Sequence, residues 1–267
     1  MAGVFKNKFS ITPQYLPKPS KRRSGLLISK VKFIVAHDTG NPKSSAAANV
    51  RFYINSKDEM SASAHLFVDD KEIIECVPAI TAPPEKAWHV LYSVPRDNEL
   101  YGVNANDAAI GVEYCYGENI DADKAYAKYL WTIAKICFDF ELDPAKAIVG
   151  HCFLDPKRKT DPVTGLIHSR RTYDQLLRDI VTEYNDCAGI VTAPPALIVK
   201  PDAGTVTVAV KLNVRKEPNT RADRVQELAP GTVIEFAGII SNGQPVNNNP
   251  VWYKDMNGNY FWSGGVK

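Results

Sequence analysis

The first two thirds of the chain alternate short apolar runs with helical patterns. Residues 31–36 and 109–114 are apolar and rich in β-branched side chains, and 147–149 repeats the pattern more briefly, so all three predict buried strands. Apolar residues recur at helical spacing over 121–141 and 172–184, which predicts two amphipathic helices. Strands that alternate with helices predict an α/β fold, with a central mixed β-sheet flanked by helices.

Smaller elements are expected between the first two strands. Residues 46–54 predict a helix, with the two serines before it as candidate N-caps. Residues 65–68 and 72–77 predict two strands joined by a short turn. The segment 78–107 shows no clear periodicity, and irregular segments of this length are usually functional or disordered.

Three further segments define the expected domain organisation. Residues 1–28 are rich in proline and lysine and predict an extended arm at the start of a first domain, 1–187. The proline-rich segment 188–203 predicts a semi-rigid linker. Residues 204–267 contain short alternating strands and the hairpin signal Asn257-Gly258, which predicts a small all-β barrel.

Composition narrows the classes of function. The chain has 267 residues, 45% of them hydrophobic, and a net charge of +2, which is too small to indicate nucleic-acid binding. No apolar run is long enough to span a membrane, and the N-terminus lacks the apolar core of a Sec signal. The five cysteines include no C-x-x-C pair, so we expect no disulfide framework. These features predict that the protein is synthesised in the cytoplasm. We also expect it to be a monomer.

Two of the five histidines directly follow predicted strands. His37 ends the first strand and His151 ends the third, and Asp161 follows ten residues after His151. Two imidazoles and a carboxylate can hold Zn²⁺ and leave a fourth position open, as catalytic zinc sites require. Spacing alone leaves a second interpretation open, in which the segment is a basic surface loop with a capping aspartate.

Glu113 is unusual because it interrupts an otherwise apolar predicted strand. Burying a carboxylate is costly unless the group is paired or functional. Beside a hydrolytic metal site it could accept a proton from water and pass it to the leaving group. The alternative is that this face of the strand points to solvent.

Five motifs together resemble the type-2 amidase family. They are HDTG at 37–40, SAHLFVDD at 63–70, AWH at 87–89, IGVE at 110–113 and GHCFLDPKRKTDP at 150–162. The family includes phage endolysin amidases, bacterial wall-recycling amidases and the peptidoglycan recognition proteins. The resemblance covers most of the predicted first domain.

The resemblance implies a zinc-dependent N-acetylmuramoyl-L-alanine amidase that acts on bacterial peptidoglycan. It implies zinc ligands at His37, His151 and Asp161, a general base at Glu113, and an oxyanion-stabilising lysine at Lys159. Many relatives carry cysteine at the third ligand position, and the aspartate here is similar to a bacterial branch of the family.

The resemblance also implies a substrate groove. His65, Trp88, His89 and Arg158 are the expected substrate-binding residues, with Trp88 and His89 as a groove wall that stacks on sugar or contacts the stem peptide. Residues 163–171, which include His168, have no counterpart in the family, and we expect a solvated loop there that alters the rim of the groove.

The C-terminal domain resembles bacterial SH3-like modules. The resemblance rests on LNVR at 212–215, on Pro218 and on PGT at 230–232, and it implies binding to the cell wall. Aromatic residues are numerous for so small a core, so some are expected to line a groove. The alternative is a tightly packed aromatic core. The candidate wall-binding residues are Trp252, Tyr253, Tyr260 and Trp262.

Several functional alternatives remain at this stage. The absence of a Sec signal fits a phage or prophage endolysin that is released to the wall by a holin, and it fits equally an effector exported by another apparatus. A non-catalytic peptidoglycan-binding module would lack one of the zinc ligands. An intracellular amidase that recycles muropeptides would not need a wall-binding domain. An unrelated, metal-free α/β enzyme would bind no zinc.

Overall fold

The computed structural model describes residues 4–190, 197–220, 222–247 and 249–267. The chain divides into two compact units, 1–191 and 192–267. Within the described residues, no helix is long and apolar enough to cross a membrane. All five cysteines are free thiols.

The first unit is built on a mixed β-sheet, as predicted. The described strands run in the order β1-β4-β3-β5-β2-β6. Neighbouring strands are parallel except for β3 and β4, which form an antiparallel hairpin. The strands are β1 (Ile11–Pro13), β2 (Phe33–Asp38), β3 (Leu66–Val68), β4 (Ile73–Glu75), β5 (Ala109–Tyr114) and β6 (Ile148–Gly150).

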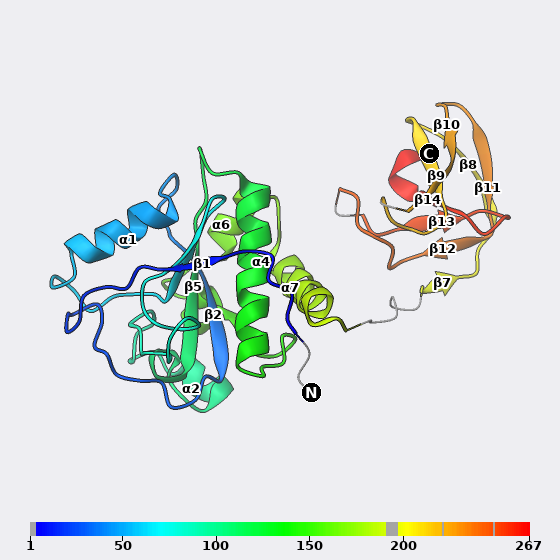
Figure 1. Cartoon of the computed structure of the whole chain (residues 1–267). Coiled ribbons are helices and arrows are strands. Elements are labelled where there is room, and N and C mark those ends of the chain that lie inside the picture. The colour runs from blue at the N-terminus through cyan, green and yellow to red at the C-terminus, as the bar shows by residue number, and fades with distance from the viewer. Residues whose placement is uncertain (1–3, 191–196, 221, 248) are drawn as a thin grey trace. The chain divides into compact units, whose positions relative to one another are not determined.

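Helices cover both faces of this sheet (Figure 1). The two long helices α4 and α7 pack against each other on one face, and α1 lies on the opposite face. Two of the four short described helices, α2 and α3, lie between β4 and β5, and the other two, α5 and α6, lie between β6 and α7. The helices are α1 (Ala46–Asn55), α2 (Arg96–Tyr101), α3 (Ala105–Ala108), α4 (Ala122–Asp139), α5 (His151–Leu154), α6 (Val163–His168) and α7 (Tyr173–Ala188).

Successive side chains of the central strands point to opposite faces of the sheet and pack into two separate apolar layers. Ile110 and Val112 of β5 belong to the apolar cluster under α4 and α7, whereas Ala109 belongs to a cluster on the other face. Because successive side chains of a strand point to opposite faces, Glu113 shares the face of Ala109. This face carries α1 at one end, where Phe67 of β3 packs with the helix. The functional side chains of β2 and β5 therefore lie opposite α4.

The helix N-termini follow the sequence signals. Ser45 caps α1, Asp121 caps α4 and Thr172 caps α7, each by accepting a hydrogen bond from a backbone N–H in the first turn. The prediction of these three helices, and of the strands 31–36 and 109–114, is confirmed to within two residues at each start.

The N-terminal arm is extended, but it is part of the sheet. β1 pairs in parallel with β4, and Phe5 and Leu16 are buried in the core. The arm shows no periodicity because its main chain is held by the neighbouring strand, and only isolated side chains enter the core. The arm therefore contributes a strand to the sheet of the first unit, which its sequence did not indicate.

Two other segments expected to be irregular contain helices. The segment 78–107 includes α2 and α3, and the segment 163–171 includes α6. These helices have only four to six residues, too few to reveal a helical period in the sequence. His168 at the end of α6 is exposed, as expected for a solvated residue, and its ring lies 4.8 Å from that of Tyr116 between centroids.

The second unit is all β. Its described strands form a sheet in the order β10-β9-β14-β13-β12-β7 and a two-stranded sheet of β11 and β8. The hairpin predicted at Asn257-Gly258 joins β13 to β14 and is confirmed. The strands are β7 (Val199–Lys200), β8 (Gly204–Thr207), β9 (Leu212–Arg215), β10 (Arg224–Leu228), β11 (Val233–Phe236), β12 (Gly238–Ile240), β13 (Trp252–Lys254) and β14 (Tyr260–Trp262).

Two sequence expectations for the second unit need correction. β7 lies inside the segment expected to be a linker, where it pairs with β12. Trp252 was a candidate wall-binding residue, but its side chain is buried and its indole N–H donates to the carbonyl of Gln244 at 2.8 Å. Trp252 therefore stabilises the fold and cannot contact a polymer. Tyr253, Tyr260 and Trp262 remain partly exposed.

Candidate metal and catalytic site

The sheet register brings the functional residues of β2 and β5 together. His37 lies directly opposite Glu113 on the neighbouring strand. On the other side of β2, Ala36 is opposite Gly150 of β6, so that His151 follows at the same level as His37. The carboxyl ends of parallel strands thus place two histidines and one glutamate at the same edge of the sheet, as such folds commonly do.

The loop after α5 carries Asp161 to this edge. The N–H of Asp155 donates to the carbonyl of His151 at 2.9 Å, which ends the short helix. The N–H of Cys152 donates to the carbonyl of Asp161 at 2.8 Å, which folds the loop back on itself. A ten-residue separation in sequence therefore becomes direct contact between Asp161 and His151.

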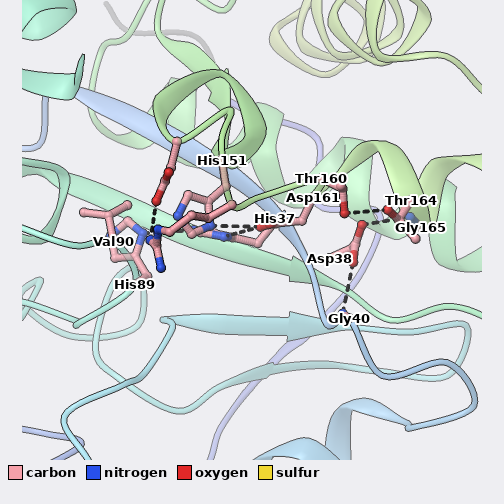
Figure 2. Close-up of polar contacts among 12 residues, drawn as sticks. His37, Asp38, Gly40, His89, Val90, His151, Thr160, Asp161, Thr164 and Gly165 are labelled. Atoms are coloured by element: carbon pink, nitrogen blue, oxygen red, sulfur yellow. Dashed lines mark hydrogen bonds and ion pairs between the residues drawn. The ribbon is translucent and has the colours of Figure 1, made fainter. Parts of the chain in front are cut away.

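Three donor atoms converge on one point. Asp161 Oδ2 lies 2.8 Å from Nδ1 of His37 and 3.0 Å from Nδ1 of His151 (Figure 2). One ligand atom from each residue lies within 4.8 Å of the other two. Two imidazole nitrogens and one carboxylate oxygen, with a fourth side open to a cavity, are a donor set that fits Zn²⁺.

The electrostatics of these residues suit a cation. Burial lowers the pKa of His37 to about 4, assisted by His151 and opposed by Asp161, so the ring is neutral and can act as a ligand at physiological pH. Burial alone would raise the pKa of Asp161, but hydrogen bonds from His151 and His37 hold it well below its usual value. The cluster therefore presents a neutral His37 ring and an anionic Asp161 carboxylate beside the ring of His151.

Glu113 has the properties of a proton acceptor. Its Oε2 atom is buried and has no hydrogen-bond partner among the described residues. Burial raises the pKa of Glu113 well above its ordinary value, Asp161 and Asp38 add to this effect, and Lys159 opposes it. A carboxylate that is buried, unpartnered and poised to take up a proton is typical of a functional group.

A cavity of about 470 Å³ contains these residues. It brings together most of the residues expected from the sequence, including the ligands, Glu113, Lys159, Trp88, His89 and Arg158. Arg158 is exposed at the rim and forms an ion pair with Asp155. The lining residues are His37, Asp38, Thr39, Gly40, Tyr53, Ala62, Ser63, Trp88, His89, Glu113, Tyr116, His151, Arg158, Lys159, Thr160, Asp161 and Thr164.

His89 lines the cavity and also contacts His37, one of the three candidate metal-ligating residues. Its Nδ1 lies 3.0 Å from Nε2 of His37, on the side of the ring opposite Asp161 (Figure 2). A Cβ atom on Gly111 would come within 2.8 Å of the His89 ring, so only glycine at that position of β5 allows this approach. The backbone of His89 is fixed by Asn106, whose side chain accepts its N–H at 2.9 Å.

His65 does not reach the cavity. Its side chain is fully buried, its Nε2 lies 2.8 Å from the carbonyl of Glu85, and its Nδ1 accepts the N–H of Gly111 at 3.0 Å. Both nitrogens are therefore used by the backbone, and the expected substrate contact of His65 is corrected to a structural role.

Some residues of the cavity were not identified from the sequence. Asp38 accepts the N–H of Gly40 at 3.0 Å and that of Gly165 at 2.8 Å, which ties α6 to the end of β2. Its place directly after a strand-end histidine was a usable signal. Tyr53 on α1 gave no such signal, because it belongs to the helical pattern of that segment. Tyr116, Thr160 and Thr164 complete the part of the wall that the sequence did not indicate.

Comparison with known families gives one match across the site. The family model described as N-acetylmuramoyl-L-alanine amidase matches residues 28–164. This range contains the three donor residues, Glu113 and Lys159, and it covers about half of the chain.

Two individual relatives are described as amidases of related muramyl-L-alanine compounds. The chain is 32% identical over 172 residues to the N-acetylmuramoyl-L-alanine amidase BlyA of Bacillus subtilis, a match that covers 61% of this chain and 45% of BlyA. It is also 32% identical over 104 residues to the 1,6-anhydro-N-acetylmuramyl-L-alanine amidase AmpD of Escherichia coli, covering 39% of this chain and 52% of AmpD. The chain thus spans about half the length of these curated relatives.

A solved structure supports the fold of the first unit. A mutant endolysin from Bacillus subtilis superposes with a TM-score of 0.51 and 27% identity, covering 64% of this chain and 99% of that one. The mixed sheet and its flanking helices are therefore shared with an experimentally determined protein.

Proposed function

The chain belongs to the N-acetylmuramoyl-L-alanine amidase family, and we propose that it hydrolyses the amide bond between N-acetylmuramic acid and L-alanine in bacterial peptidoglycan, with zinc as its cofactor. One observation carries the proposal. A three-residue donor set and a buried, unpartnered glutamate share one cavity at the carboxyl edge of the sheet.

The donor set decides which cofactor fits. His37, His151 and Asp161 would hold the ion, and nitrogen and carboxylate donors favour Zn²⁺ over the all-oxygen sites of Mg²⁺ or Ca²⁺. When bound, the ion supplies Lewis-acid polarisation of the scissile carbonyl and lowers the pKa of water. His89 keeps the ring of His37 oriented through the contact at Nε2.

The remaining steps belong to two side chains. Glu113 accepts the proton of the attacking water, because its raised pKa makes it a stronger base than an ordinary carboxylate. It then donates this proton to the nitrogen of L-alanine as the amide bond breaks. The ammonium group of Lys159 lines the same cavity and stabilises the negative charge that develops on the carbonyl oxygen.

The substrate side of the cavity is open and polar. Trp88 offers an aromatic surface for a sugar ring, and Arg158 offers a charged group to the stem peptide. The second unit acts as an SH3-like wall-binding domain in this proposal, with Tyr253, Tyr260 and Trp262 as its partly exposed aromatic residues. The protein acts at the cell wall as an endolysin, in keeping with its likeness to a bacillar endolysin.

Product analysis tests the reaction. Purified peptidoglycan is digested with the full chain in the presence of zinc, and the products are identified by mass spectrometry. The expected result is free L-alanine amino termini together with intact glycan strands. Cleaved glycan strands, cleavage within the stem peptide, or no cleavage would each contradict the proposal.

A soluble substrate is the second candidate, because the relative AmpD is named for 1,6-anhydro-muropeptides. The same digestion, run in parallel on polymeric wall and on isolated anhydro-muropeptides, separates the two. Faster turnover of the polymer supports the endolysin assignment, whereas turnover of the soluble compound alone supports a recycling enzyme.

A further inference from the structure

Tyr92 is an aromatic residue on the surface beside the metal-site cavity. Its side chain is 56% exposed, and the centroid of its ring lies 6.4 Å from that of Trp88. Trp88 lines the cavity, whereas Tyr92 is not one of the lining residues. Exposed apolar surface that continues from a cavity often belongs to a binding groove. The two rings therefore extend an aromatic surface from the cavity outward.

The hydroxyl of Tyr92 holds the exposed ring in place. It donates to Oδ1 of Asp107 at 3.0 Å, and the ammonium group of Lys86 donates to the same oxygen at 2.7 Å. Asp107 belongs to the short helix α3. The polar end of the ring is thus anchored while much of its surface stays exposed. A ligand that contacts this ring would not have to immobilise a free side chain, which favours binding.

The main chain between the two rings is also fixed. The side-chain carbonyl of Asn106 accepts the N–H groups of His89 and Val90 at 2.9 and 3.0 Å. The side-chain amide of Asn106 donates in return to the carbonyl of Val90 at 2.9 Å. Trp88 and Tyr92 therefore stand on one segment that is held before any ligand arrives.

The charges near Tyr92 indicate which part of the proposed substrate fits there. Lys86 and Asp107 form an ion pair at 2.7 Å, and this pair carries no net charge. Arg158 and Lys159, in contrast, bring cationic groups to the cavity from the loop after α5. A stem peptide carries free carboxylates and suits cationic groups, whereas N-acetylated sugars are uncharged and have apolar faces that suit aromatic rings. The surface around Tyr92 therefore favours sugar over peptide.

We propose that Trp88 and Tyr92 form a glycan-binding subsite, in which Tyr92 stacks on the sugar next to the N-acetylmuramic acid whose amide bond is cleaved. The inference rests on the proposed amidase function for the identity of the ligand. It extends the binding surface beyond the cavity, and it explains how the enzyme would prefer a glycan strand to a single muramoyl peptide.

The dependence of affinity on glycan length tests the proposal. All variants are made in the full chain carrying Glu113→Gln and loaded with zinc, and dissociation constants are measured by calorimetry. One ligand is an N-acetylmuramoyl tripeptide, and the other is a trisaccharide that carries the same unit between two N-acetylglucosamine residues. The parent is expected to bind the trisaccharide more tightly. Tyr92→Ala is expected to reduce this gain in affinity about 3- to 10-fold, the value of one aromatic stacking contact.

Two further variants separate stacking from other causes. Tyr92→Phe keeps the ring but loses the hydrogen bond to Asp107, so its gain should lie between those of the parent and Tyr92→Ala. Leu100→Ala removes an exposed apolar side chain from α2, away from the lining of the cavity, and should keep the gain of the parent. The second unit is unchanged in every variant, so any affinity of its own for sugar cancels in the comparison.

Three results would overturn the proposal. They are no gain in the parent, a gain in Tyr92→Ala equal to that of the parent, and an equal loss in Leu100→Ala. A muramoyl pentapeptide is measured in parallel. If Tyr92→Ala abolishes a gain from the longer peptide and leaves the gain from the longer glycan intact, the surface binds the stem peptide and the proposal is wrong.

Cleavage is measured separately in the protein that retains Glu113, so that the two proposals can fail independently. A protein that cleaves no peptidoglycan, but whose gain in affinity for the longer glycan depends on Tyr92, would refute the proposed reaction and leave the glycan-binding subsite standing.

Discussion

Two glutamates on the same sheet, Glu75 and Glu113, differ in how their carboxylates are satisfied. Glu75, at the end of β4, accepts hydrogen bonds from the backbone N–H groups of Ala79, Ile80 and Thr81 and from the hydroxyl of Tyr15. Glu113, on β5, has an Oε2 atom with no partner among the described residues. Glu75 therefore stabilises a turn, whereas Glu113 is left available for chemistry.

A related contrast separates two buried histidines. Both nitrogens of His65 are bonded to backbone groups, whereas both nitrogens of His37 contact side chains that line the cavity, Asp161 at Nδ1 and His89 at Nε2. Both histidines are satisfied, but only His37 has a carboxylate partner with which it could share a metal ion. Burial of a polar or charged residue therefore does not by itself indicate a functional role. The groups that the residue contacts indicate whether its role is structural or functional.

The largest expected effect comes from Glu113→Gln. Loss of the base should lower kcat by roughly 10²–10⁴-fold, while the midpoint of thermal unfolding stays the same or rises, because a desolvated, unpartnered carboxylate is removed. Dye release from labelled peptidoglycan and calorimetric unfolding measure the two quantities. Activity equal to that of the parent would show that Glu113 is not the base.

Glu75→Gln should lower the stability of the protein and leave its activity nearly unchanged, the opposite of Glu113→Gln. An amide cannot accept all the hydrogen bonds of the carboxylate, so the free energy of unfolding should fall by about 2–4 kcal/mol, while kcat of the folded protein changes little. Urea denaturation measures the change in stability. Glu118→Gln, at a residue whose side chain is 75% exposed, serves as the control and should shift stability by less than about 0.5 kcal/mol. Equal stability of the Glu75 and Glu118 variants would remove the contrast.

Acid should destabilise the metal-free protein through its buried histidines. Burial lowers the pKa of His65 to about 4, so between about pH 6.5 and 4 the unfolded chain takes up a proton that the folded chain does not. Stability is therefore retained above pH 6.5 and lost as the pH falls toward 4, by up to ~3 kcal/mol for this residue. Urea midpoints between pH 7 and 4.5, in chelator, should show a shallower decline for His65→Gln and an unchanged one for His168→Gln.

The smallest expected effect is stabilisation by zinc. At a free concentration one hundred times its dissociation constant, a ligand of the folded state adds about 2.7 kcal/mol. Zinc should therefore raise the unfolding temperature of the parent, and His151→Ala should abolish both this rise and the bound metal, measured by atomic absorption. His168→Ala should keep both. A His151 variant with full zinc content would show that His151 is not a ligand.

Strong local signals made much of the fold predictable. The central strands are continuous β-branched runs and the long helices have both period and caps, so residues such as Ser45 and Thr172 marked their starts. β1, α2, α3 and α6 were missed, because three to six residues carry too little pattern and their positions depend on tertiary contacts. The pairing of β1 with β4, for example, joins segments about sixty residues apart.

The site was predictable where it depends on strand ends, and not where it depends on packing. His37, Glu113 and His151 follow from the register of parallel strands. His65 and Trp252 were assigned to binding by residue type, which does not show whether a side chain points into the core. Tyr53 was missed because it belongs to the helical pattern of α1, which does not show that its side chain reaches the cavity.

The short strand β1 also governs how the protein can be shortened. It covers the outer side of β4, so the main-chain groups of β4 on that side are already in use. Trimming the chain to the family-matching residues would uncover that row of N–H and C=O groups, and a bare sheet border readily recruits strands from other molecules. Fragments that begin after the arm would then tend to aggregate during expression, whereas fragments that keep the arm would stay in solution.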